Sequence, residues 1–160
     1  MSTMNMTFVF TAAMTMTLMV TGCASGHGGK NSTAVSPGMN AKGEVVNSAE
    51  VESGYGQQVK GINDWEGEVT GKPVPNSKFK KLQIGMSSKQ VIDLMGQPND
   101  QGTYVTPKAW LPMYYGDDRY RSEFVYKGQG RLIFAGGSLG DFSPGYLIWI
   151  IHNANEGSSR

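Results

Sequence analysis

The sequence predicts a two-layer α+β domain, with two short helices packed on one face of an antiparallel sheet of three to four strands. Two observations lead to this prediction. Apolar residues between 87 and 96 recur at helical spacing, whereas those after residue 100 alternate with a period of two. Clusters of Gly, Asn, Asp and Pro separate the alternating runs, as they do between strands. The predicted domain covers residues 75–155, near the lower size limit for a core without disulfide bonds.

The first predicted helix is a short one, Lys78–Leu82, which Asn76 or Ser77 can cap. The second helix is better defined because Ser87 is followed three residues later by Gln90. This spacing is that of a capping box, in which each side chain bonds to the backbone of the other residue. The pair therefore predicts a helix start at residue 87.

The second helix has one apolar face and a marked end. Val91, Leu94 and Met95 stand at i, i+3 and i+4, so they are expected on the same face. Gly96 suits the left-handed conformation that ends many helices, and Pro98 stops further propagation. A helix of this length is stable only when it packs on another element.

The remaining elements are predicted as strands of one sheet. Residues 127–130 form the turn of a hairpin, and two longer loops cover residues 107–118 and 136–145. The predicted strands are Gly102–Thr106, Tyr120–Tyr126, Arg131–Ala135 and Tyr146–His152.

The N-terminal residues 1–22 are predicted to be a signal peptide. The apolar run Thr7–Val20 is shorter than the roughly 20 residues that span a bilayer. Val20-Thr21-Gly22-Cys23 follows and resembles the lipobox of bacterial lipoproteins, in which the cysteine carries the lipid. The start lacks Lys and Arg, so a misassigned start codon, an uncleaved anchor and a fortuitous cysteine stay open. By resemblance to Gram-negative lipoproteins, Ala24 in place of Asp favours delivery to the outer membrane.

Residues 23–74 are predicted to be the lipidated Cys23 and a flexible tether rich in Gly, Ser and Asn. Plain disorder and folding on a partner both remain open for residues 24–60, and the scattered apolar residues between Val45 and Trp65 could add a short strand or a docking segment. Trp65 would be the anchor if the segment folds on a partner. Residues 156–160 are predicted to be a tail.

Five short motifs occur in a fixed order in the predicted domain: Ile84-Gly85-Met86-Ser87, Gln90-Val91, Leu94-Met95-Gly96-Gln97-Pro98, Phe124-Val125-Tyr126 and Leu132-Ile133-Phe134. With these motifs the chain resembles the SmpA/OmlA family of small outer-membrane lipoproteins over residues 82–151. The resemblance implies the two-layer fold and a role near the outer-membrane assembly machinery.

The sequence predicts no catalytic residue, metal site or cofactor. Its 14 basic and 13 acidic residues give no basic face of the kind that binds nucleic acid. The two histidines, His27 and His152, are far apart, and a metal site needs several ligands together. The carboxylates Asp117, Asp118 and Asp141 are expected in solvated turns, with weak calcium binding as the alternative.

The loop after residue 106 is the predicted partner-binding surface. It contains Trp110, Leu111, Met113, Tyr114 and Tyr115 within a few positions. Exposed aromatic residues and Met mark many protein interfaces. The alternative is that these side chains fold back over the small sheet.

These features together predict a lipid-anchored, periplasm-facing outer-membrane lipoprotein that is not an enzyme. Its partners would be the membrane, through Cys23, and an envelope or outer-membrane assembly protein. Two alternatives remain: a structural lipoprotein that contacts lipid or peptidoglycan, and an inhibitor-like binding module for a secreted enzyme.

Overall fold

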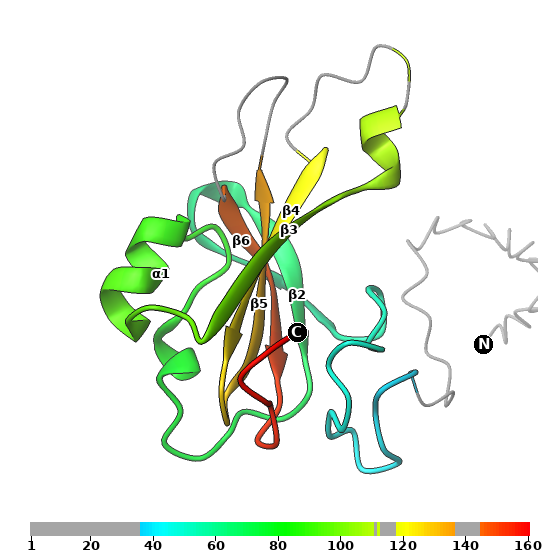
Figure 1. The fold of residues 1–160 in the computed structure, drawn as a ribbon, viewed down its shortest axis with the longest axis vertical. Coiled ribbons are helices and arrows are strands. Elements are labelled where there is room, and N and C mark those ends of the chain that lie inside the picture. The colour runs from blue at the N-terminus through cyan, green and yellow to red at the C-terminus, as the bar shows by residue number, and fades with distance from the viewer. Residues whose placement is uncertain (1–35, 111, 113–117, 137–144) are drawn as a thin grey trace, which may run out of the picture.

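A computed structural model of the chain describes residues 36–110, 112, 118–136 and 145–160. These residues form one six-stranded sheet, in the order β1-β2-β6-β5-β4-β3. Figure 1 shows α1 on one side of this sheet and the chain that precedes β1 on the other. The strands are β1 (Gln57–Lys60), β2 (Glu66–Thr70), β3 (Asp100–Val105), β4 (Tyr120–Tyr126), β5 (Gly130–Gly136) and β6 (Tyr146–His152).

One α-helix, α1 (Ser88–Met95), occurs among the described residues. Its capping box is confirmed, because the Ser87 hydroxyl accepts from the backbone N–H of Gln90 and the Gln90 side chain accepts from Ser87 N–H. Gly96 ends the helix at a φ of 88°, and the hydroxyl of Tyr126 donates to the Gly96 carbonyl at 3.0 Å. Burial raises the pKa of Tyr126 to about 12, so the hydroxyl stays protonated as a donor.

The core between α1 and the sheet is almost wholly apolar. Val91 and Met95 of the helix are buried there, whereas Leu94 stays 42% exposed, so the predicted face is only partly confirmed. Three short 3-10 helices accompany the sheet: η1 (Ile62–Asp64), η2 (Lys78–Lys81) and η3 (Pro107–Trp110). The core cluster consists of Phe79, Leu82, Ile84, Val91, Met95, Phe124, Tyr126, Leu132, Phe134, Leu147 and Ile150.

The predicted fold class is wrong in three respects. The sheet has six strands instead of three or four, and it is mixed because β2 runs parallel to β6. The helix expected at Lys78–Leu82 is the 3-10 helix η2, so a single α-helix covers the sheet. The two additional strands, β1 and β2, come from residues that the sequence assigned to the tether.

The parallel pairing explains why β2 escaped the sequence reasoning. Its residues, Glu66–Thr70, include only one large apolar side chain, and they pair with a strand about eighty residues later. Gly67 is needed there, because a Cβ on it would lie 2.2 Å from the carbonyl oxygen of Ile148. Such a close backbone approach is visible in the structure and not in a hydropathy pattern.

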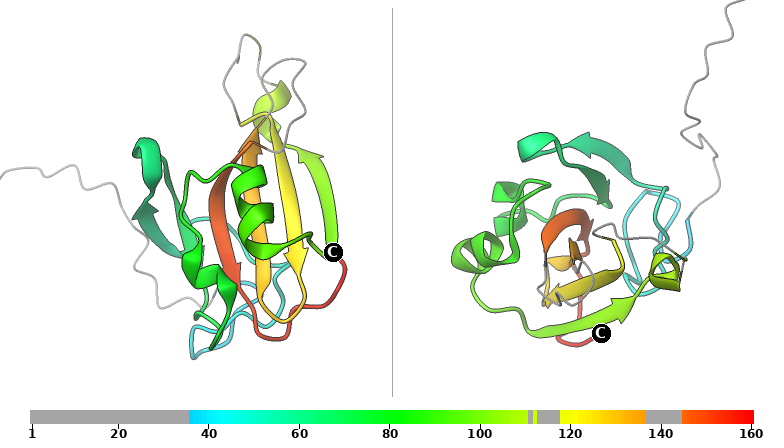
Figure 2. Two further views of the ribbon diagram at one scale, coloured as in Figure 1. Left: turned by 90° about the vertical axis from the view of Figure 1, so that its left-hand side faces the viewer. Right: turned by 90° about the horizontal axis from the view of Figure 1, so that it is seen from above.

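The second face of the sheet is covered by two segments (Figure 2): residues 36–56, called the cover below, and the C-terminal segment after β6. Val45 and Val51 pack there against Ile133, Trp149 and Ile151 of the sheet. Residues 36–56 contain no regular helix or strand. Turns, the bridge between Met39 and Val45 and hydrogen bonds to side chains such as that of Glu68 hold their backbone. The two faces of one sheet are therefore closed by very different kinds of structure.

Buried polar side chains attach this cover to the sheet. Arg131 of β5 donates to Glu156 at 2.7 Å and to Glu123 at 2.8 Å. Glu156 also accepts a hydrogen bond from the hydroxyl of Ser48, and Asn153 donates to both of these residues. The network joins the cover, the sheet and the C-terminal segment.

Candidate functional site

The partner-binding loop predicted from the sequence leaves the sheet after β3. Trp110 is the last residue of η3, and its side chain is 81% exposed, the most exposed large apolar residue of the described chain. Leu111, Met113, Tyr114 and Tyr115 lie outside the described residues. Trp110 is therefore a surface residue that does not cover the sheet, and its role in binding a partner stays a prediction.

Two residues of β3, the strand that leads into η3, are also exposed. Tyr104 is 43% exposed and Val105 is 48% exposed, and as consecutive residues of a strand they lie on opposite faces of its end nearest η3. Complete burial of a large apolar side chain against a partner releases roughly 1.5–3 kcal/mol. The three residues, Trp110, Tyr104 and Val105, are called the β3 surface below.

Asp118 holds the two ends of the loop together. Its carboxylate accepts from Arg121 at 2.9 and 3.1 Å and from Lys108 at 2.7 Å, while its backbone carbonyl accepts from the hydroxyl of Thr106. Burial alone would raise the pKa of Asp118, but the hydrogen bonds from Arg121 and Lys108 outweigh burial and lower the pKa. The carboxylate is therefore charged at neutral pH, and Trp110 follows a fixed stretch of chain.

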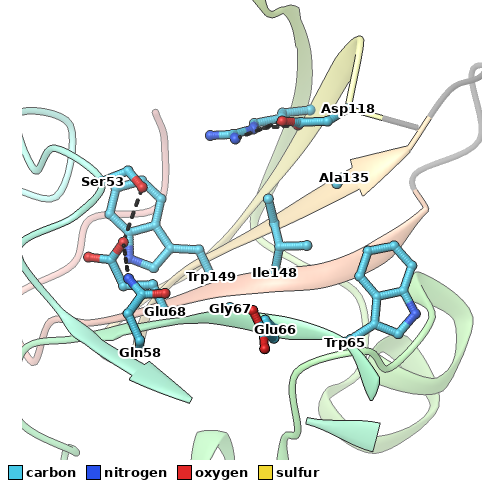
Figure 3. A pocket seen from close by; sticks show the side chains of 11 residues that line it. Ser53, Gln58, Trp65, Glu66, Gly67, Glu68, Asp118, Ala135, Ile148 and Trp149 are labelled. Carbon is cyan, nitrogen blue, oxygen red and sulfur yellow. Dashed lines mark hydrogen bonds and ion pairs between the residues drawn. The ribbon is translucent and has the colours of Figure 1, made fainter. Parts of the chain in front are cut away.

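A shallow hollow of about 270 Å³ lies on the second face of the sheet, beyond the cover (Figure 3). Ile148, Ala135 and Trp149 line its apolar part, and Trp65 and Asp118 stand on different sides of it. The Trp65 ring stacks on Tyr146 with centroids 5.0 Å apart. Trp65, predicted as the anchor of a tether, is thus part of the folded sheet region.

Glu68 is the buried carboxylate next to this hollow, at 4% exposure. Its oxygens accept from the backbone N–H groups of Gly54 and Gly56, at 2.7 and 2.5 Å, and from the hydroxyls of Ser53 and Thr70. Hydrogen bonds of this kind stabilise a buried charge and fix the turn before β1. Both oxygens are engaged, so Glu68 is a structural anchor for the cover. Sequence reasoning missed it, since one Glu among polar residues gives no signal.

A second hollow, of about 490 Å³, lies where the cover, the chain after β2 and the C-terminal segment meet. His152 lines it at 5% exposure, and its Nδ1 has no hydrogen-bond partner among the described residues. Burial lowers the pKa of His152, so the ring is neutral at neutral pH. Lys72 and Glu44 form an exposed ion pair in the same hollow.

The remaining candidates are divided between described and undescribed parts of the chain. Cys23, His27, Asp117 and Asp141 lie outside the described residues. Trp149 is a core residue, 7% exposed, with its indole N–H donating to Thr70 at 2.9 Å.

Two features are absent from the described residues: a cluster of metal ligands and a helix that could span a membrane. No group of three or more His, Cys, Asp or Glu side chains in this part of the chain could hold a metal ion. No described helix has the length and apolar content needed to cross a bilayer.

Comparisons with protein-family models, with curated proteins and with solved structures gave no match to this chain. The site must therefore be judged on its own geometry.

Proposed function

We propose that the chain is an outer-membrane lipoprotein, anchored through Cys23, whose folded domain binds an envelope protein through the β3 surface. The resemblance to the SmpA/OmlA family and the lipobox support the anchoring. The observation that carries the binding role is the 81% exposure of Trp110 next to a loop end that is held in place. A single exposed apolar residue is common, but a Trp this exposed, close in the chain to the exposed residues Tyr104 and Val105, is a candidate for an interface.

The anchoring is tested by membrane fractionation and mass analysis of the mature N-terminus, with Cys23→Ser as the comparison. We expect the wild type in the outer-membrane fraction, with acyl chains on Cys23 and residues 1–22 removed. More than one acyl chain gives stable attachment, so the unmodified Cys23→Ser protein should be released or left unprocessed. A soluble wild type, or one that keeps residues 1–22, would contradict the anchoring.

The binding role is tested with a photo-crosslinking phenylalanine analogue in place of Trp110 in intact cells. The matched control carries the analogue in place of Val46, which is 56% exposed on the cover, away from the β3 surface. We expect one dominant adduct with an envelope protein from position 110, and none from position 46. Equal labelling from both positions, or no adduct from position 110, would contradict the proposed surface.

A further inference from the structure

The outer edge of β3 has backbone groups available for another strand. Among the described residues, β3 is the last strand of the sheet and pairs only with β4. Thr106 donates its N–H to Arg119 at 2.9 Å, which fixes the alternation of the antiparallel ladder. Counting back from Thr106, the N–H and C=O groups of Gln101, Thr103 and Val105 point away from β4. The 3.2 Å contact between the Thr103 and Ser122 hydroxyls agrees, since side chains approach most closely at pairs without backbone bonds.

This edge lacks the features that usually prevent edge-to-edge pairing. Proteins protect edge strands with Lys, Pro, bulges or short length. β3 has six residues in unbroken register with β4, and no charged residue follows Asp100 in it. The opposite edge differs, because β1 has four residues and carries Lys60. Among the described residues, no backbone–backbone hydrogen bond from outside β4 reaches Gln101, Thr103 or Val105.

The edge is also complementary to itself. If a second copy pairs antiparallel around Thr103, then Thr103 faces Thr103, and Gln101 faces Val105 of the other copy. All three residues present their backbone groups outward, so this one register forms about six hydrogen bonds between the copies. The side chains that meet are uncharged, and no like charges face each other across the axis.

The same register matches the other surface of the strand. Tyr104 of one copy falls opposite Gly102 of the second copy, at a pair without backbone bonds. Gly102 has no side chain, and the guanidinium group of Arg160 occupies the space where its Cβ would be. Arg160 is held there by hydrogen bonds to Asp100 at 3.0 and 3.2 Å. The half-exposed Tyr104 ring therefore meets a cation of the second copy, which is a favourable contact.

We infer that two copies of this chain associate through β3, which joins their sheets into one continuous sheet across a twofold axis at Thr103. The interface has only a few residue pairs, below the size of stable protein interfaces, so the dimer is weak and depends on concentration. The dimer uses Tyr104 and the backbone of Val105, which also belong to the β3 surface, and it leaves Trp110 in each copy for a different partner. The dimer is tested with this chain alone and the proposed function with an envelope partner, so either can fail without the other.

The test is sedimentation of the full-length chain in detergent over about two decades of concentration, for the wild type and two proline variants. Val105→Pro removes an outward N–H of β3, and Gln58→Pro removes one of β1. The second assignment follows from the inward bond of Gly61 N–H to Trp65. We expect dimerisation by the wild type and Gln58→Pro, and at least a tenfold weaker dimer for Val105→Pro with an unchanged circular dichroism spectrum. A wild type that stays monomeric, or a dimer that folded Val105→Pro leaves intact, overturns the inference.

A crosslinking measurement covers the case in which Val105→Pro fails to fold. In a Cys23→Ser background, Thr103→Cys places one thiol per copy at the axis, where facing Cα atoms are close enough for a disulfide. Gln58→Cys is the matched control on β1. We expect an intermolecular disulfide under mild oxidation from position 103 and not from position 58. A disulfide from both positions, or from position 58 alone, overturns the inference. So does an adduct of position 103 only with a different protein.

Discussion

Different interactions hold the covering segments on the two faces of the sheet. On the α1 face, a capped helix and η2 seal a cluster of apolar side chains around Leu132 and Phe134. On the second face, the cover has only Val45 and Val51 as buried apolar residues, and the polar network of Arg131 and the anchor Glu68 complete the attachment. Apolar packing is tolerant of direction, whereas a buried charge must find particular partners. The first face should therefore carry more of the stability, and the second face should be the more sensitive to a single missing group.

Adjacent residues of β5 test this difference most directly. Leu132 and Ile133 are 0% and 3% exposed, and they point to opposite faces. We expect Leu132→Ala to lower the free energy of unfolding by about 3–5 kcal/mol, and Ile133→Ala by about 2–3 kcal/mol. The irregular cover can settle into the smaller gap, whereas the capped helix cannot. Urea unfolding followed by circular dichroism measures both; an equal or larger loss for Ile133→Ala would remove the distinction between the faces.

Replacing a single residue of the polar network should lower the free energy of unfolding by nearly as much as these core substitutions do. Arg131→Met leaves the carboxylates of Glu123 and Glu156 without their cation, with Glu156 only 5% exposed. We expect a loss of about 3 kcal/mol in the free energy of unfolding. Adding Glu156→Gln should recover part of it, because the buried unpaired charge is then absent. As a control, Arg160→Met removes a more exposed pair with Asp100, which water screens, so the loss should be much smaller than for Arg131→Met.

The smallest effect should come from His152 and should depend on pH. Burial lowers its folded-state pKa, so the unfolded chain binds the proton more readily. Above the unfolded-state pKa of about 6.5, His152 is neutral in both states and costs the folded state nothing. As the pH drops below that value, the unfolded chain binds a proton that the folded state does not, so the free energy of unfolding falls. Lys72 and Glu44, which form an ion pair in the same hollow, carry opposite charges, so their effects on the pKa of His152 oppose each other. We expect His152→Leu to lose less stability than the wild type between neutral and mildly acidic pH, as measured by thermal unfolding. An identical pH dependence in both proteins would show that His152 does not titrate on unfolding.

The difference between the faces also explains which parts of the fold the sequence could predict. The Ser87–Gln90 capping box and the β4–β5 hairpin are local, because their residues are close in the chain, and both are found where they were expected. β6 coincides with the predicted strand Tyr146–His152. Local propensity and periodicity fix such elements before any long-range contact forms.

The second face could not be predicted for the opposite reason. The turn at Gly54 and Gly56 directs two N–H groups toward Glu68 and allows its carboxylate to be buried, and β2 is a strand because β1 and β6 pair with it on either side. Both depend on chain segments that a hydropathy pattern treats as independent. At the candidate site, Trp110 was found through its residue type, whereas the clamp at Asp118 needed the approach of Lys108 and Arg121. Asp118 had been expected to be a solvated turn residue.

The position of the cover in the chain has a mechanical consequence. Residues 36–56 come before every strand, and β1 and β2 form the neighbouring edge of the sheet. A pull from the N-terminal side therefore reaches the cover first, then peels β1 and β2, before it loads β6, β5, β4 and α1. The polar attachments around Glu156 and Glu68 would yield one after another, as hydrogen bonds do when load opens them in sequence. The cover would unfold first under load and lengthen the chain, while the helix-covered half of the sheet stays folded.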